Sequence, residues 1–113
     1  MHEMALAESI IQIVEDTART HGASRVSAVT VEVGQLAGVE LDALRFCFDA
    51  VSRGSAAEGA RLEVVQPDGQ AWCLPCARTV TIAAAGEPCP HCGSYQLQVT
   101  GGTELKVKDI EIH

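Results

Sequence analysis

Residues 73–93 read CLPCARTVTIAAAGEPCPHCG, and this stretch decides the fold of the C-terminal half of the chain. It contains two Cys-x-x-Cys pairs, Cys73 with Cys76 and Cys89 with Cys92, which twelve residues separate. Two residues between paired cysteines let one tight turn direct both sulfurs at the same ion, and Zn²⁺ is satisfied by a tetrahedron of four thiolates. The stretch therefore predicts a structural zinc site on a small, zinc-ribbon-like module.

Two other uses of these cysteines are weighed against zinc. A thioredoxin-like redox site needs one pair at the start of a helix, whereas this chain has two matched pairs close together. A rubredoxin-like site would hold a single iron, and the colour of ferric thiolate would reveal it. Four thiolates leave no open coordination position on the ion, so the cluster predicts no catalysis. We therefore expect that the chain is not an enzyme. His91 could replace a thiol under some conditions or could be an exposed turn residue.

Residues 1–66 predict two helices and two strands. Apolar residues recur at helical spacing over 4–20, and Gly22 follows where a helix would end. Residues 25–34 are β-branched and alternate between two faces, as in a half-exposed strand. A second helical pattern ends near Gly54, and a short alternating strand follows. The buried stripe of the second helix is predicted to contain Leu41, Leu44, Cys47, Phe48 and Val51.

The cysteine module is predicted to interrupt a larger domain. Pro67, Asp68 and Gly69 break the strand pattern before it, and strand-like stretches at 79–83 and 95–100 follow its cysteine pairs. Residues 104–112 resume an apolar alternation whose parity changes near Lys108 and Asp109, which predicts a bulge. This strand is expected to join the sheet of the first two. The fold class is therefore α+β: two helices on a three-stranded sheet, residues 1–66 plus 101–113, with a zinc-binding domain inserted at 67–100.

Composition and charge narrow the classes of function. The chain of 113 residues is 47% hydrophobic and 20% charged, which suits a packed core. Its formal charge of −7 repels a phosphate backbone, so nucleic acid is not an expected partner. No apolar run is long enough to cross a bilayer, and paired cysteines in a reducing compartment favour a metal site over disulfides. We therefore expect no membrane association and a cytoplasmic location.

The first residues, Met1-His2-Glu3, form a possible second metal site. The amine of Met1, the backbone nitrogen of His2 and its imidazole Nδ1 can close two chelate rings around one ion. Three nitrogens in a plane suit Ni(II) or Cu(II), and Glu3 is a candidate for a further ligand. Taken alone, a histidine at position two is more often part of a solvated terminus. His21, at the predicted end of the first helix, is explained by its favourable interaction with the negative helix terminus.

An ordered set of motifs resembles one known family, the HypA/HybF nickel metallochaperones. The resemblance runs nearly end to end. It comprises Met1-His2-Glu3, Val31-Glu32-Val33-Gly34, Gly38-Val39-Glu40, both cysteine pairs with Cys89-Pro90-His91-Cys92-Gly93-Ser94, Gly102-Thr103-Glu104-Leu105 and Asp109-Ile110-Glu111.

The resemblance implies delivery of Ni(II) as cargo for maturation of [NiFe]-hydrogenase and, in some bacteria, urease. It implies His2 as the principal nickel ligand, assisted by Met1, with Glu3 and Glu40 close by, and a structural Zn(II) on the four cysteines. The partners it implies are a HypB-type nickel-handling GTPase and the precursor of the hydrogenase large subunit. It leaves open whether the chain is a monomer or a dimer. The alternative hypothesis is a zinc-ribbon interaction module without nickel transfer, against which the acidic balance counts.

Overall fold

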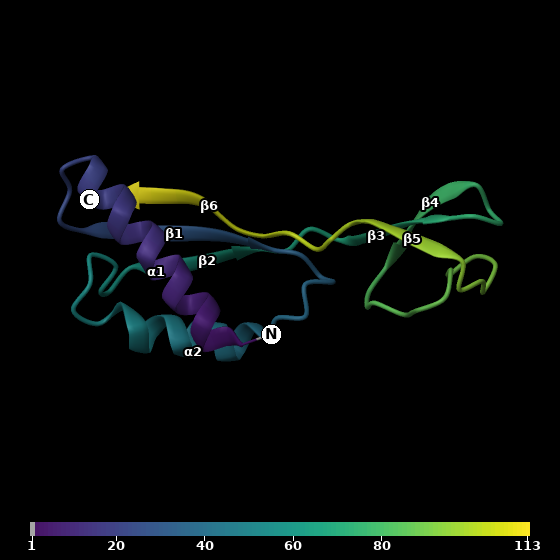
Figure 1. Cartoon of the computed structure of the whole chain (residues 1–113), viewed down its shortest axis with the longest axis horizontal. Coiled ribbons are helices and arrows are strands. Elements are labelled where there is room, and N and C mark those ends of the chain that lie inside the picture. Colours follow the sequence, from purple (N-terminus) through teal and green to yellow (C-terminus); the bar gives the residue numbers. More distant parts are fainter. Residues whose placement is uncertain (1) are drawn as a thin grey trace. The chain divides into compact units, whose positions relative to one another are not determined.

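The computed structural model describes residues 2–113, which form two compact units (Figure 1). The first unit contains the chain up to Val31 together with Val39–Val64 and Lys106–His113, and the second contains Glu32–Gly38 and Val65–Leu105. The chain therefore passes between the units several times. The sequence predicts a nickel-binding domain at residues 1–66 plus 101–113 and a zinc-binding domain at 67–100. This division is defined by metal binding, which the compact units do not test, so it stays a prediction.

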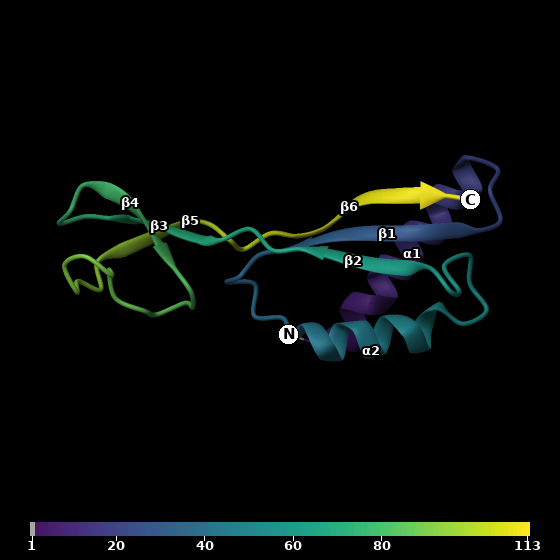
Figure 2. The same cartoon turned by 180° about the vertical axis from the view of Figure 1, so that it is seen from behind.

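Two helices and a three-stranded sheet make up the first unit. The helices are α1 (Glu3–Thr20) and α2 (Leu41–Ser52), and the strands are β1 (Val26–Val33), β2 (Arg61–Val65) and β6 (Leu105–Ile112). The strand order is β2-β1-β6, so the last strand joins the first two as the sequence predicts. Figure 2 shows β1 between the other two strands from the opposite side.

The core of the first unit is aliphatic. Helix α1 buries the residues that recur at helical spacing, namely Ala7, Ile10, Ile11, Val14 and Ala18. In β1, Val29 and Val31 are buried while Thr30 is partly exposed, which confirms the predicted alternation. Helix α2 buries Leu44 and Phe48, whereas Cys47 on the same stripe is only half-buried. Burial of these side chains supplies the main stabilisation of the unit.

The second unit is a three-stranded sheet of order β4-β3-β5. Its strands are β3 (Gly69–Cys73), β4 (Arg78–Ile82) and β5 (Leu97–Gly101), and β3 pairs antiparallel with both neighbours. The sequence predicts β4 and β5 but misses β3, because Pro67-Asp68-Gly69 is typical of a turn. A small core forms on one face from Ala71, Cys73, Val80, Ile82 and Cys89. Two cysteines thus belong to the core of the unit that they organise.

Three glycines of the second unit lie where backbones approach closely. A Cβ atom on Gly34 would overlap the carbonyl group of Gly102 and lie 2.8 Å from Glu104 Oε1. A Cβ atom on Gly69 would overlap the carbonyl oxygen of Ile82. Gly102 has φ +92°, and a Cβ there would lie 2.7 Å from the carbonyl oxygen of Asp68. Only glycine fits at such approaches, so the course of the chain here depends on all three.

Candidate metal centres

The four cysteines are presented by two turns of the same shape. Cys73 ends β3, and the amide of Ala77 donates to its carbonyl oxygen at 2.8 Å; the amide of Gly93 donates to the carbonyl oxygen of Cys89 at 2.9 Å. The residue after each pair has a positive φ, 51° at Ala77 and 76° at Gly93. Glycine adopts this conformation without strain, and alanine does not.

The geometry of the sulfurs fits a tetrahedral ion. The four Sγ atoms all lie within 4.8 Å of one another, with Cys73 and Cys92 3.6 Å apart and Cys76 and Cys89 3.9 Å apart. A Zn–S distance of about 2.3 Å in a regular tetrahedron places sulfurs about 3.8 Å from each other. The cluster therefore has the size that zinc needs without rearrangement of the turns.

The electrostatics of the cluster also favour a cation. Backbone amides of Cys92 and His91 point at the sulfur of Cys89 and lower its pKa to about 6, the His91 amide lying 3.4 Å from that sulfur. A hydrogen bond with the Cys92 side chain, together with burial, raises the pKa of Cys76 to about 12. The cluster thus has one sulfur ready to carry negative charge beside thiols that hold their protons. A bound metal ion displaces such protons.

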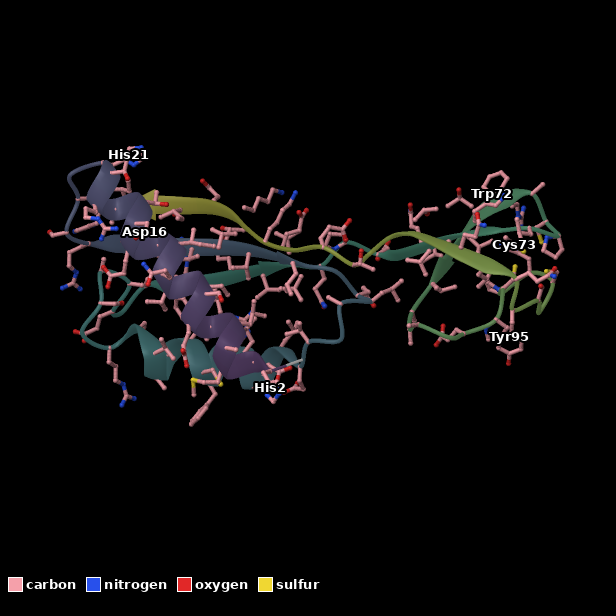
Figure 3. All side chains as sticks on the ribbon, viewed as in Figure 1. His2, Asp16, His21, Trp72, Cys73 and Tyr95 are labelled. Atoms are coloured by element: carbon pink, nitrogen blue, oxygen red, sulfur yellow. The ribbon has the colours of Figure 1, made fainter. Side chains whose placement is uncertain are left out.

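Three of the predicted nickel residues, His2, Glu3 and Glu40, lie at the starts of the two helices of the first unit. Met1 is outside the described residues. His2 directly precedes α1 with extended backbone (φ −86°, ψ 101°), and its exposed side chain makes no capping hydrogen bond. Figure 3 shows His2 at the opposite end of α1 from His21. His21 Nδ1 lies 2.9 Å from the carbonyl oxygen of Thr17, which agrees with its predicted place at the helix end.

Glu3 and Glu40 are brought together although 37 residues separate them. Oε2 of Glu3 accepts a hydrogen bond from the Glu40 backbone amide at 2.9 Å, and this bond lowers the pKa of Glu3. Glu40 caps α2, because its carboxylate accepts from the amides of Asp42 at 3.2 Å and Ala43 at 2.8 Å. The local sequence holds no signal for this hydrogen bond, since the resemblance implies only that both carboxylates lie close to nickel.

Within residues 2–113, the four thiols form the one group of three or more His, Cys, Asp or Glu side chains that is close enough to share an ion. His2, Glu3 and Glu40 therefore do not form a preassembled cluster of side chains. Among the same residues, no helix is long and apolar enough to cross a membrane.

Comparison with known proteins gives a consistent result over the whole length. A family model described as hydrogenase/urease nickel incorporation, metallochaperone, hypA matches residues 1–112. The chain is 57% identical over 112 residues to a hydrogenase maturation factor HypA from Alkalilimnicola ehrlichii and 55% identical to one from Albidiferax ferrireducens, covering 99% of this chain and of each relative.

Solved structures support the fold. The solution structure of the Ni metallochaperone HypA from Helicobacter pylori superposes with a TM-score of 0.69 over 99% of this chain and 97% of that one, at 23% identity. A second solution structure of a HypA protein gives a TM-score of 0.70, also at 23% identity. With the model match and the relatives above 50% identity, the chain belongs to the HypA family of non-enzymatic metallochaperones for nickel incorporation into hydrogenase and urease.

Proposed function

We propose that this chain carries Ni(II) on the residues that begin α1 and holds a structural Zn(II) on its four cysteines. The observation that carries the nickel assignment is the exposed His2, which directly precedes α1 in a chain whose family serves nickel incorporation. The amine of Met1, the backbone nitrogen of His2 and its imidazole Nδ1 supply three nitrogens for a planar site. Such a nitrogen set suits Ni(II) and not zinc.

An exposed site suits a carrier, because cargo must be released as well as bound. His2 stands outside the core of the first unit, and its side chain has no capping hydrogen bond to break. A partner can therefore approach the ion and exchange ligands one at a time. The His2 carbonyl oxygen accepts a hydrogen bond from the Leu6 amide at 3.1 Å. The first turn of α1 therefore fixes the peptide group that joins His2 to Glu3.

Glu3 and Glu40 are proposed as the acidic residues near nickel. Both carboxylates already accept hydrogen bonds from backbone amides. The donor–acceptor distance is 2.9 Å for Glu3, and the two distances for Glu40 are 2.8 and 3.2 Å. A carboxylate oxygen has a second lone pair, so a hydrogen bond does not prevent coordination. Glu3 is the neighbour of His2 and the better candidate for a fourth ligand. Glu40 positions Glu3 through its amide and adds negative charge nearby.

Zinc at Cys73, Cys76, Cys89 and Cys92 has a structural role in this proposal. Four thiolates close the coordination shell, and Cys73 and Cys89 are also part of the buried core of the second unit. Loss of zinc would leave that small core without its main cross-link. Ligand exchange with His91 remains a prediction of the sequence.

The partners proposed for transfer are a HypB-type nickel-handling GTPase and the precursor of the [NiFe]-hydrogenase large subunit, and the proposed location is the cytoplasm. Membership in a family of hydrogenase maturation factors supports partners within the maturation machinery. Nickel would move by ligand exchange without a bond-making step on this chain.

The test compares nickel binding in four proteins by competition with a chromophoric chelator. They are the native chain, His2→Ala, a version with two residues added before Met1, and His113→Ala as the matched control for loss of one exposed imidazole. Tight binding should be lost in His2→Ala and in the extended version and kept in His113→Ala. Tight binding by all four would contradict the N-terminal site, and weak binding by the native chain itself would favour a zinc-ribbon module without nickel transfer.

A further inference from the structure

The four thiols of the cysteine cluster differ in how far solvent reaches them. Cys73 and Cys89 are 0% and 2% exposed and belong to the core of the second unit. Cys76 is half-buried, whereas Cys92 is exposed. A reagent dissolved in water therefore meets the sulfur of Cys92 before the other three.

The turn around Cys92 leaves this sulfur open and nucleophilic. His91 is exposed, and Gly93 has no side chain with which to cover its neighbour. The buried Cys89 differs, because the His91 amide lies 3.4 Å from its sulfur, and such hydrogen bonds draw electron density away from a thiolate. A cysteine that binds zinc does so as the thiolate, which is also the form that reacts with oxidants. Cys92 thus combines exposure with thiolate character.

A second thiol lies beside Cys92 and can complete an oxidation. The sulfur of Cys73, on the other turn of the cluster, is 3.6 Å from the sulfur of Cys92. Cysteines that sense oxidants are accessible thiolates, often with a resolving cysteine next to them. A disulfide has a sulfur–sulfur distance of about 2.05 Å, so a small movement of the two turns brings this pair into bonding distance.

We propose that Cys92 is a modification site for peroxides, at which oxidation opens the zinc cluster and joins Cys92 to Cys73 in a disulfide. The Cys92 thiolate attacks one oxygen of hydrogen peroxide, the O–O bond breaks, and hydroxide leaves; the product is a sulfenic acid on Cys92. The Cys73 thiolate then attacks the sulfur of that acid, the S–O bond breaks, and a second hydroxide leaves. The peroxide gains two electrons from two thiolates, and two protons from solvent convert both hydroxides to water.

The disulfide has opposite effects on the ion and on the protein. Two of the four thiolates that zinc needs are lost, so the cluster releases its ion. The two turns stay cross-linked, because Cys73 and Cys92 come from different Cys-x-x-Cys pairs. The second unit therefore exchanges a metal cross-link for a covalent one, which a thiol reductant can reverse. This inference rests on the proposed zinc site and is independent of the proposed nickel site.

The first test maps the oxidised thiols of the zinc-loaded native chain after treatment with less than one equivalent of hydrogen peroxide in the absence of air. Trypsin separates the cysteines into three peptides: residues 46–53 contain Cys47, residues 62–78 contain the first pair, and residues 79–106 contain the second pair. A disulfide between the two turns links two peptides, whereas one within a turn leaves all three separate. Mass spectrometry should find linked peptides with the bond at Cys73 and Cys92. Dimedone, which traps sulfenic acids, should label Cys92.

The second test compares matched variants by the rate at which peroxide releases zinc to a chromophoric chelator. Cys92→His and Cys76→His each exchange one thiol for an imidazole, which structural zinc sites also accept. Cys92→His should release zinc about tenfold or more slowly than Cys76→His, because only the latter keeps the exposed thiolate and its resolving partner. Cys47→Ala should match the native chain, since Cys47 lies on α2 in the first unit.

The outcomes separate this inference from the proposed zinc site. A freshly purified native chain without zinc would contradict the zinc site itself. In a zinc-loaded chain, oxidation that begins at Cys47, a first disulfide between Cys89 and Cys92, or zinc that stays bound after Cys92 is oxidised would overturn this inference alone. Equal release rates from Cys92→His and Cys76→His would do the same. If either variant does not bind zinc, the peptide map of the native chain decides.

Discussion

The close approach at Gly34 predicts a large effect from a single methyl group. Gly34→Ala adds a Cβ that overlaps the Gly102 carbonyl group and lies 2.8 Å from Glu104 Oε1. Ordinary carbon–oxygen contacts begin near 3.4 Å, so the backbones must separate. The φ of Gly34 is not in the left-handed region, so alanine meets a loss of space and not a strained torsion.

The magnitude follows from what that separation weakens. The Gly34 amide donates to the Glu104 carbonyl oxygen at 2.8 Å, and the Leu36 amide donates to the Gly102 carbonyl oxygen at 2.7 Å. About 1 kcal/mol for each bond and about 1 kcal/mol of overpacking strain give about 3 kcal/mol of lost stability. We expect the second unit to carry this loss, because these residues all belong to it.

Trp72 makes the assay specific for the second unit. It is the one tryptophan of the chain and lies on β3. Its fluorescence during urea denaturation follows the second unit, while circular dichroism at 222 nm follows α1 and α2. The two units need not unfold together, so each probe is fitted separately. Gly34→Ala should shift the fluorescence transition and leave the dichroism transition close to that of the native chain.

Gly101→Ala is the matched control. A Cβ on Gly101 would lie 3.8 Å from Gln70 Cβ, an ordinary contact, and its φ is not positive. Its stability should stay within about 0.5 kcal/mol of the native value. If Gly34→Ala is as stable as Gly101→Ala, the close approach of the backbones does not exist and the reasoning fails.

Three further predictions concern the turns and the helix starts. Ala77→Gly should stabilise the zinc-loaded second unit by about 0.5–1 kcal/mol, because it relieves a φ of 51° in a turn that otherwise matches the one at Gly93; no gain by Trp72 fluorescence would contradict this. Glu40→Ala should lower the stability of the helical transition by about 1 kcal/mol through loss of the α2 cap, and Glu40→Asp should retain most of it; equal losses would argue against the cap. Because the pKa of Glu3 lies below its ordinary 4.5, its bond to the Glu40 amide should be complete above pH 4.5 and be lost as the pH falls through the lower folded value; the Glu40 amide NMR shift should follow this titration in the native chain and not in Glu3→Gln.

Repeated spacing and strong periodicity made much of the fold predictable. The two Cys-x-x-Cys pairs specify one ion because the spacing itself aims the sulfurs, and the structure places the four Sγ atoms within 4.8 Å. The apolar period of α1 and the alternation in β1 gave those elements their type and buried faces. The predicted parity change in β6 agrees with its burial pattern. The resemblance to the HypA family is confirmed by the family match over residues 1–112.

Features that depend on distant parts of the chain were not predictable from local pattern. Strand β3 is short and begins at Gly69, and its pairing with β4 and β5 outweighs the turn signal before it. The contact of Glu3 with the Glu40 amide joins residues 37 apart. The same holds for Gly34, which lies against the backbone of Gly102, and for Gly102, which lies against the backbone of Asp68 and Gly69. Such requirements become visible only when the segments meet.

The central claim is that one chain holds two different metals at separate sites, and native mass spectrometry after loading with zinc and nickel tests it most directly. The native chain should carry one zinc and one nickel. His2→Ala should keep zinc and lose nickel, whereas Cys73→Ala should lose zinc and keep nickel, because Cys73 lies in the core of the second unit and His2 belongs to the first. Nickel retained in His2→Ala, or lost together with zinc in Cys73→Ala, would contradict the account.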